Sequence, residues 1–506
     1  MRPHLLFPDR DFDPRTAHPW AWSDLERDLD LETVFGAMAQ GDTFTLDIVR
    51  RVVLSGPGED AATIHHRQEI LRDVLKTPAF IRSLQSIVAD AVAADGRHYL
   101  GTLTQYPSQV LRWSSELIPD LLIQARRLRA LADDATGTLS APGWQAFLAM
   151  LRSELDDAFF LRAESVLQEV RRDRGLLLSA TLGPGLKGRS LTLHRPPEPP
   201  RGWRVWLFPP KPGKHGFTIN ARDQAGTSML SELRDRGTAI AAAALGHTAD
   251  HVRGFFHALR HELAFYLGCL ALHERLAAIG APTCVPETAD PGARVLAGRG
   301  VYDLSLALRR GAAVVGNDFD AGGKGILVVT GANQGGKTTF LRSLGLAQLM
   351  TQCGMFAAAE MFRTGLCDRL FTHFRREEDA AMASGKLDEE LARMSAIVDH
   401  LGPFSMVLFN ESFSATNERE GSEIATQIVS ALLERGIRLA FVTHLYEFPH
   451  ALHERDAGRA AFLRADRARS FRLSAGEPLR TAHAEDLYER VFGGDTKGAP
   501  PARGAA

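Results

Sequence analysis

The sequence predicts a C-terminal α/β domain of the phosphate-loop type, preceded by a mainly α-helical region. Two observations lead to this fold class. Gly325–Leu341 reads as an apolar β-strand, a glycine-rich turn and the start of a helix, which is the setting of a phosphate-binding loop. Residues 1–180 and Thr238–Ile279 carry apolar side chains at helical spacing.

The glycine-rich turn, Gly331-Ala-Asn-Gln-Gly-Gly-Lys-Thr338, has the residue types that phosphate binding needs. Glycines let backbone N–H groups close around phosphate oxygens, and the helix that begins near Lys337 adds partial positive charge. We expect Lys337 to reach the β- and γ-phosphates and the Thr338 hydroxyl to ligate Mg²⁺. The alternative, a glycine-rich turn that binds nothing, requires a chance match to the full pattern, which we expect about once per hundred such chains.

The composition is that of a globular protein and carries no global signature of nucleic-acid binding. At 506 residues the chain is long enough for roughly two to four domains. The formal net charge is −2, so any nucleic-acid site must be local. The four cysteines have no metal or redox spacing, no signal peptide is recognisable, and no apolar run approaches the ~20 residues that span a bilayer. We therefore expect a cytoplasmic protein.

The helical region contains four stretches with one apolar face each. They lie at Trp20–Met38, at Ile64–Leu75, from Trp144 to Leu178, and from Thr238 to Ile279, where Gly280 and Pro282 are the expected stop. His65 and His66 are adjacent in the second stretch and diverge by ~100° on a helix, so we expect solvated or hydrogen-bonded histidines and no joint metal site. The two long helices, joined through a short excursion, predict a lever arm.

The excursion at about residues 183–225 is rich in proline and glycine and locally basic. Its short alternating runs, Leu191–Leu193, Val205–Phe208 and Phe217–Ile219, suit a small β-hairpin or ribbon. Basic and aromatic side chains together are typical of contact with a phosphate backbone, whereas the alternative is a solvated tip with a local mini-core. Both interpretations stay open. The residues concerned are Arg189, Arg195, Arg201, Arg204, Lys211 and Lys214 against Glu198 alone, with Trp203, Trp206 and Phe208 between them.

Two further apolar runs end in polar residues that suit nucleotide chemistry. Phe404–Phe409 leads into Asn410 and Glu411, which is the layout of a second nucleotide-site strand (Walker B). Asn410 brings no charge to a metal, so Mg²⁺ affinity should fall, while Glu411 is placed to polarise a water; the alternative is a strand-end glutamate that caps a helix. Arg438–Thr443 ends at His444, and residues just past parallel strands line the ligand crevice, so we expect His444 near the γ-phosphate.

With these segments in view, the chain resembles the MutS family of DNA mismatch-repair proteins. Residues 316–446 resemble its ATPase domain, an ABC-type P-loop fold, and residues 1–290 resemble its helical core and lever domains. The segments that carry the resemblance are NDF (317–319), TGANQGGKTTFLR (330–342), DRLFTHF (368–374), SGKLDEEL (384–391), LFNESFSATNEREGSEIA (408–425), VTHLYE (442–447) and, more weakly, IHHRQEILRDVL (64–75).

The resemblance implies a dimeric, ATP-hydrolysing protein that binds duplex or branched DNA and moves its lever arms with nucleotide state. It implies Glu411 as the general base and His444 as the γ-phosphate switch. Thr338 and Asn410 would serve the metal, Asn410 through a bound water. The residues implied for ATP are Gly331, Ala332, Asn333, Gln334, Gly335, Gly336, Lys337, Thr338 and Thr339.

Departures from the family pattern narrow the expected function. We expect a short member without the N-terminal mismatch-recognition and connector domains, and hence without direct mismatch recognition. Ser412–Thr416 replaces the usual Gly-Arg-Gly, and Ser384–Leu387 is shorter than the family's serine-bearing segment, so contacts across a dimer are in question. The expected domains are 1–290 (helical) and 291–492 (ATPase), with a disordered tail at 493–506.

Two alternatives belong to other functional classes. A nucleotide-gated assembly module with weak ATPase activity and no direct DNA binding would suit Asn410 and the near-neutral charge. A small-molecule kinase is disfavoured, because Glu411 and His444 suit water activation and no arginine-rich lid follows.

Overall fold

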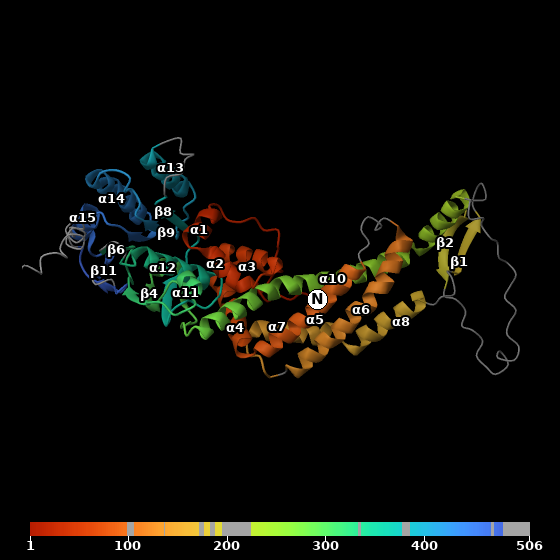
Figure 1. The fold of residues 1–506 in the computed structure, drawn as a ribbon. Helices are drawn as coiled ribbons and strands as arrows, with labels where there is room; N and C mark the ends of the chain where they lie inside the picture. Colours follow the sequence, from red (N-terminus) through yellow and green to blue (C-terminus); the bar gives the residue numbers. More distant parts are fainter. Residues whose placement is uncertain are drawn as a thin grey trace, which may run out of the picture. The chain divides into compact units, whose positions relative to one another are not determined.

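The structure, a computed structural model, describes residues 1–98, 106–135, 137–171, 177–182, 188–194, 224–331, 335–376, 385–466 and 470–478 (Figure 1). Within these residues the chain forms two compact units. One comprises Met1–His4, Ala79–Ser140 and Trp144–Glu262; the other comprises Leu5–Pro78, Ala141–Gly143 and the chain from Leu263 onward. These units divide the chain differently from the expected boundary at residue 290, because the first helices pack with the C-terminal sheets. The expected tail at 493–506 lies outside the described residues.

A six-stranded sheet with the order β12-β11-β6-β10-β9-β8 forms the centre of the second unit. All neighbouring strands in it pair in parallel except β12, which is antiparallel to β11. The strands β6, β8, β9 and β10 are buried almost throughout, which explains why they are rich in apolar residues on both faces. The bounds are β6 (Ile326–Gly331), β8 (Leu370–Phe374), β9 (Met406–Asn410), β10 (Arg438–Val442), β11 (Ala460–Ala465) and β12 (Leu473–Ala475).

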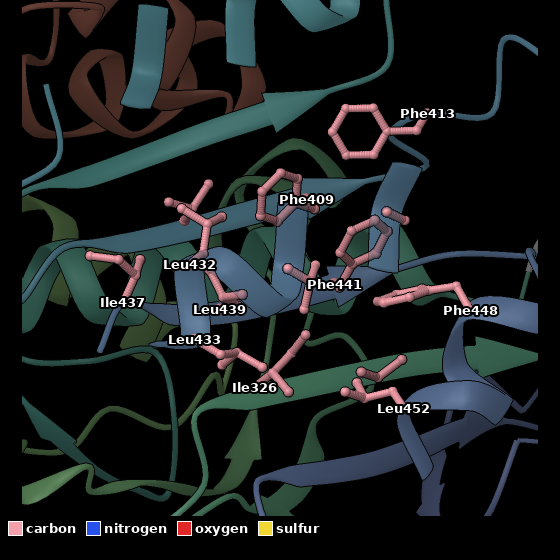
Figure 2. Close-up of a cluster of buried hydrophobic side chains, with 14 of the residues drawn as sticks. Ile326, Phe409, Phe413, Leu432, Leu433, Ile437, Leu439, Phe441, Phe448 and Leu452 are labelled. Atoms are coloured by element: carbon pink, nitrogen blue, oxygen red, sulfur yellow. The ribbon is translucent and has the colours of Figure 1, made fainter. Parts of the chain in front are cut away.

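Helices cover both faces of this sheet, as Figure 1 shows. On one face lies α12 (Lys337–Gln352), where Gly345 allows close packing: a Cβ there would come within 2.6 Å of Leu408. On the other face lie α13 (Lys386–Asp399), α14 (Glu418–Glu434) and α15 (Glu447–Asp456), whose apolar stripes meet the side chains of the strands. Figure 2 shows this core, in which Phe409 and Phe441 stack with ring centroids 4.9 Å apart.

A second, four-stranded sheet in the same unit was not predicted from the sequence. Its order is β3-β7-β4-β5, and only the pairing of β3 with β7 is parallel. Its strands are short or interrupted by glycine, so no clear alternation signals them. The elements are β3 (Glu287–Ala289), the 3₁₀ helix η3 (Pro291–Ala293), β4 (Leu296–Val301), α11 (Leu304–Arg310), β5 (Asn317–Asp320) and β7 (Met361–Gly365).

The N-terminal helices of the second unit correct one prediction and refine another. The apolar face predicted for Trp20–Met38 is divided between two helices, because Asp30 adopts a left-handed conformation (φ 56°). The helix predicted at Ile64–Leu75 is present and slightly longer than predicted. At its N-terminus the Asp60 side chain accepts a hydrogen bond from the Thr63 backbone N–H. The helices are α1 (Trp22–Asp28), α2 (Leu31–Ala39), α3 (Thr43–Ser55) and α4 (Ala61–Lys76). Nε2 of His65 lies 3.1 Å from the Thr288 hydroxyl, which agrees with a hydrogen-bonded histidine.

The first unit is mainly helical and contains most of a 55-residue helix, α10 (Gln224–Ala278). This helix begins well before the predicted start near Thr238. The pattern predicted for Trp144–Leu178 is two helices, followed by β1, which begins at Leu177. The elements are α5 (Pro78–Arg97), α6 (Pro107–Asp134), α7 (Pro142–Glu154), α8 (Asp157–Arg171), β1 (Leu177–Leu182) and β2 (Gly188–His194).

The predicted hairpin is partly present, because β1 and β2 form an antiparallel pair that contains Leu191–Leu193. The other two predicted runs, Val205–Phe208 and Phe217–Ile219, and the basic residues Arg201, Arg204 and Lys211 lie outside the described residues. None of the described helices is long and apolar enough to cross a membrane.

Candidate functional site

The glycine-rich turn joins β6 to α12 at the carboxyl end of the parallel sheet. Gly331 and Gly336 both have positive φ angles, 113° and 89°, which glycine adopts without the cost that a side chain imposes. A Cβ on Gly331 would also approach backbone atoms of Ala465 to 2.8 Å, so β11 packs against the turn only because this position is glycine. Ala332, Asn333 and Gln334 lie outside the described residues.

Lys337, at the first position of α12, points back to the turn. Its side chain is buried, and its Nζ donates to the Gly331 carbonyl at 2.9 Å and lies 3.8 Å from Oε1 of Glu411. Burial lowers the pKa of this lysine, while the nearby carboxylate opposes that effect. A buried ammonium in this position stabilises negative charge strongly, because little water screens it.

Glu411 follows β9 and lies among groups from three strand ends. Its backbone N–H donates to the Val442 carbonyl at 2.9 Å, which ties it to the end of β10. Its Oε2 accepts from the His444 backbone N–H at 3.1 Å and lies 2.5 Å from the ring atom Nδ1 of His444. Lys337, Glu411 and His444, which the sequence predicted to meet, therefore lie together.

The side-chain oxygens of Thr338 and Asn410 lie close together beside this group. The Thr338 hydroxyl donates to Oδ1 of Asn410 at 2.9 Å, and Thr338 is solvent-exposed. Hydroxyl and amide oxygens are hard ligands that suit Mg²⁺, which usually keeps several waters and uses few protein ligands. The pair therefore fits a magnesium ion, although neither side chain brings a negative charge.

A pocket of about 490 Å³ opens next to the turn. This volume is in the range of small-molecule sites. Its walls combine the phosphate-loop residues with apolar side chains from distant segments. They are formed by Leu306, Arg310, Val314, Val315, Asn317, Gly336, Lys337, Thr338, Thr339, Glu411 and Phe471.

Sequence reasoning missed most of the far wall of this pocket. Phe471 is 48% exposed, and Asn317 holds its segment with both amide atoms: Nδ2 donates to the Phe471 carbonyl at 3.2 Å, and Oδ1 accepts from the Leu473 N–H at 2.7 Å. The sequence places Asn317 in a segment that resembles the MutS family, but it predicts no contact for this side chain. Nothing in the local pattern around Val315 or Phe471 indicates that these residues, more than 150 positions apart, share a wall.

The fold and the site define an α/β protein in which polar and charged side chains gather at the carboxyl ends of parallel strands, where ligands of such folds usually bind. Two known protein families match separate parts of the chain. Residues 59–279 match the family described as the MutS2 N-terminal domain, and residues 327–473 match MutS domain V, a P-loop ATPase domain. The chain belongs to the MutS family.

Several curated proteins are similar to part of the chain. The DNA mismatch repair protein MutS of Chloroflexus aurantiacus is 34% identical over 138 residues, which cover 26% of this chain and 14% of that protein. The endonuclease MutS2 of Thermus thermophilus is 34% identical over 141 residues, covering 28% of this chain and 19% of that protein. The MutS of a Synechococcus strain is 35% identical over 126 residues. The matched segments thus span less than a fifth of the relatives' length.

Proposed function

We propose that this chain binds and hydrolyses ATP and binds DNA, as a MutS-like protein. The observation that carries the ATP part is the convergence of Lys337, Glu411 and His444 beside the Thr338–Asn410 pair, at one end of a parallel sheet. Of these groups, Lys337, Thr338 and Glu411 border a pocket large enough for a nucleoside. Membership of the MutS family supports the proposal.

The residues assigned to the phosphates are those of the turn and of the first turn of α12. In the structure Lys337 donates to a backbone carbonyl, Gly331 O, and a phosphate oxygen would be a stronger, charged acceptor for it. The backbone N–H groups at the start of α12 add further donors. The assigned residues are Gly331, Ala332, Asn333, Gln334, Gly335, Gly336, Lys337, Thr338 and Thr339.

Magnesium would be held by the Thr338 hydroxyl, with Asn410 accepting from a metal-bound water, and would neutralise phosphate charge. Because Thr338 already donates to Asn410, the two side chains are oriented toward one position before any ligand binds. Asn410 contributes an oxygen without a charge, so this protein should need more Mg²⁺ than a relative with aspartate.

The pocket beyond the phosphates is assigned to the base and ribose. Its apolar walls at Val314, Val315 and Phe471 suit a flat ring, and stacking on an aromatic face is the usual way to hold one. Asn317 fixes the Phe471 segment and therefore the width of the pocket.

Hydrolysis is assigned to Glu411 as the general base. Its carboxylate accepts from two groups of His444 and lies near the Lys337 ammonium, so it is oriented before substrate arrives. In the proposed step Oε1 or Oε2 takes a proton from water as that water attacks the γ-phosphorus. The bond between the γ-phosphorus and the β–γ bridging oxygen breaks, and ADP and phosphate leave. The ring of His444, which is partly exposed, would contact the γ-phosphate. Because the same ring contacts the Glu411 carboxylate, binding of the γ-phosphate would change the position of that carboxylate.

DNA binding, dimer formation and lever movement rest on the family and on the sequence. We assign the basic excursion, with Arg201, Arg204 and Lys211, to contact with the DNA backbone. We assign α10 as the lever arm that moves when the bound nucleotide changes. Duplex or branched DNA is the proposed target.

The test measures the ATPase rate of the protein without DNA, with linear DNA and with branched DNA. Gel-shift titrations at several salt concentrations measure the affinity for the same DNA molecules. Neutralisation of phosphates by basic side chains gives a steep negative slope of log affinity against log salt. We expect the slope to flatten when Arg201, Arg204 and Lys211 are all replaced by alanine. Absence of DNA binding at low salt would contradict the DNA part of the proposal and leave ATP hydrolysis to be judged on its own rate.

A second candidate function is a nucleotide-gated assembly module that contacts protein and hydrolyses ATP weakly. Asn410 favours it, because this side chain brings no negative charge to a metal ion beside Thr338. ATP-dependent change of oligomeric state with neither DNA binding nor DNA stimulation would support this alternative.

A further inference from the structure

The backbone that carries Glu411 is bent into an unfavourable conformation. Glu411 and Phe413 have φ angles of 54° and 61°, in the left-handed region that side chains other than glycine rarely adopt. Such conformations persist only where surrounding contacts impose them, and they concentrate at functional sites. The contacts that impose this one come from a buried set of side chains, Glu390, His373, Ser412 and Phe413, here called the anchor cluster.

Glu390 on α13 makes the most direct of these contacts. Glu390 is 5% exposed, and its Oε2 accepts from the backbone N–H of Phe413 at 2.7 Å. A buried carboxylate is costly unless it is hydrogen-bonded or paired, so this bond stabilises the group there, together with the nearby Arg393 and Arg375. Burial raises the pKa of Glu390, and the Phe413 N–H acts in the opposite direction. Through this bond α13 is tied to the chain two residues after the proposed base.

The side chain of Phe413 is fully buried and holds the same turn from the other side. Its ring lies on that of His373, with centroids 5.3 Å apart and planes 24° apart, and next to Phe409 (Figure 2). Its carbonyl approaches α14 so closely that a Cβ on Gly421 would lie 2.3 Å from it. The turn therefore cannot relax toward α14 or toward the core.

His373 and Ser412 complete the anchor cluster through hydrogen bonds to backbone carbonyls. Nε2 of His373 faces the Glu390 carbonyl at 3.0 Å, and a carbonyl only accepts, so Nε2 carries the proton. The Ser412 hydroxyl donates to the His373 carbonyl at 2.6 Å, and its oxygen lies 2.8 Å from Nδ1 of the same histidine. Burial lowers the pKa of His373 to about 4, which agrees with a neutral ring.

We propose that Glu390 is a positioning residue: by holding the Phe413 N–H it fixes the left-handed turn and thus places the Glu411 carboxylate against His444 and Lys337. This inference rests on the proposed role of Glu411 as general base. Because α13 contacts the chain two residues after Glu411, a displacement of α13 would move Glu411. The phosphate-binding turn would stay in place.

The first test separates turnover from binding. In Glu390→Ala we expect kcat for ATP to fall about ten- to hundred-fold, the usual effect of misplacing a reacting group by about 1 Å, with the Kd for ATP within about twofold of wild type. Glu390→Gln keeps an acceptor oxygen for the Phe413 N–H and should recover most of kcat. The matched control is Glu389→Ala, the neighbouring glutamate, which pairs with Arg376 at 3.7 Å and does not contact the turn. Equal kcat in Glu390→Ala and wild type would overturn the proposal, as would an equal loss in Glu390→Ala and Glu390→Gln.

The second test asks whether Glu390 acts through Glu411. If it does, Glu390→Ala should cost little further rate in a Glu411→Gln background, whereas independent effects would multiply and contradict the proposal. Crystal structures decide the matter without catalysis: the Glu411–His444 contact should persist in Glu390→Gln and be lost in Glu390→Ala. A wild-type protein that hydrolyses no ATP would defeat the proposed function, while these structures would still support or refute the positioning role.

Discussion

The Thr338 hydroxyl donates a hydrogen bond of 2.9 Å to the side-chain oxygen of Asn410, which links the first turn of α12 to the end of β9. Both side chains supply oxygen, and neither supplies charge. A carboxylate at position 410 would form charge-assisted contacts, which are about twice as strong as neutral ones.

Asn410→Asp should therefore lower the Mg²⁺ concentration that gives half-maximal ATP hydrolysis, by about tenfold. The measurement is ATPase rate against Mg²⁺ at saturating ATP. Asn410→Ala serves as control, because it removes the oxygen and should shift the Mg²⁺ requirement upward. An unchanged Mg²⁺ dependence in Asn410→Asp would mean that position 410 does not act on the metal.

Lys337→Ala should abolish ATP binding. The substitution removes a buried ammonium whose charge-assisted bonds to phosphate contribute about 1.5–3 kcal/mol each, so we expect Kd to rise at least about 100-fold. Equilibrium binding of a fluorescent ATP analogue measures it. Lys324→Ala is the control, because that exposed ammonium donates to the Gly458 carbonyl at 2.9 Å, away from the pocket. Binding of near wild-type strength in Lys337→Ala would remove this lysine from the phosphate site.

Phe471→Ala should weaken ATP binding about tenfold without affecting inorganic triphosphate, because stacking of one base on an aromatic ring contributes about 1–3 kcal/mol. Competition of both ligands against a labelled nucleotide separates the two effects. Phe404→Ala removes another exposed phenylalanine, one that does not line the pocket, and should change neither affinity. A parallel loss for triphosphate in Phe471→Ala would show that this residue supports the fold of the site and does not hold the base.

Stability should fall in acid because of His373. Burial lowers the pKa of this histidine to about 4, below its unfolded value of 6.5, so the unfolded chain binds the extra proton first. The stabilisation is complete above pH 6.5 and is lost as the pH falls toward 4, with a slope of about 1.4 kcal/mol per pH unit from this one group. Urea unfolding between pH 4.5 and 7 in wild type and His373→Gln measures it. The two proteins should differ in slope over that range, and identical slopes would contradict a neutral, buried His373.

The chemistry-bearing residues were predictable because they follow buried strands in the sequence. Glu411 and His444 stand just after apolar runs, Lys337 and Thr338 follow one through the glycine-rich turn, and parallel strands bring such ends together. The pocket wall was not predictable in this way. Val315 and Phe471 belong to exposed segments without periodicity, and both line the pocket, where Asn317 bonds the second segment.

Local preference also misleads at two turns. An aspartate at position 30 and a phenylalanine at position 413 both have positive φ angles, which only tertiary contacts impose. At Asp30 the result is two helices where one apolar face was predicted. At Phe413 it is the anchor cluster, whose members come from β8, α13 and the loop after β9, and whose contacts leave no local sequence signal.

Single-turnover hydrolysis of ATP by wild type and Glu411→Gln, with ATP binding measured on the same samples, tests the central claim most directly. Glutamine keeps the size of Glu411 but cannot take a proton from water. The expected result is ATP binding within about twofold of wild type together with at least a hundred-fold slower cleavage, which corresponds to about 2.7 kcal/mol of barrier. Equal cleavage rates in the two proteins would show that Glu411 is not the general base and that this site works by another route.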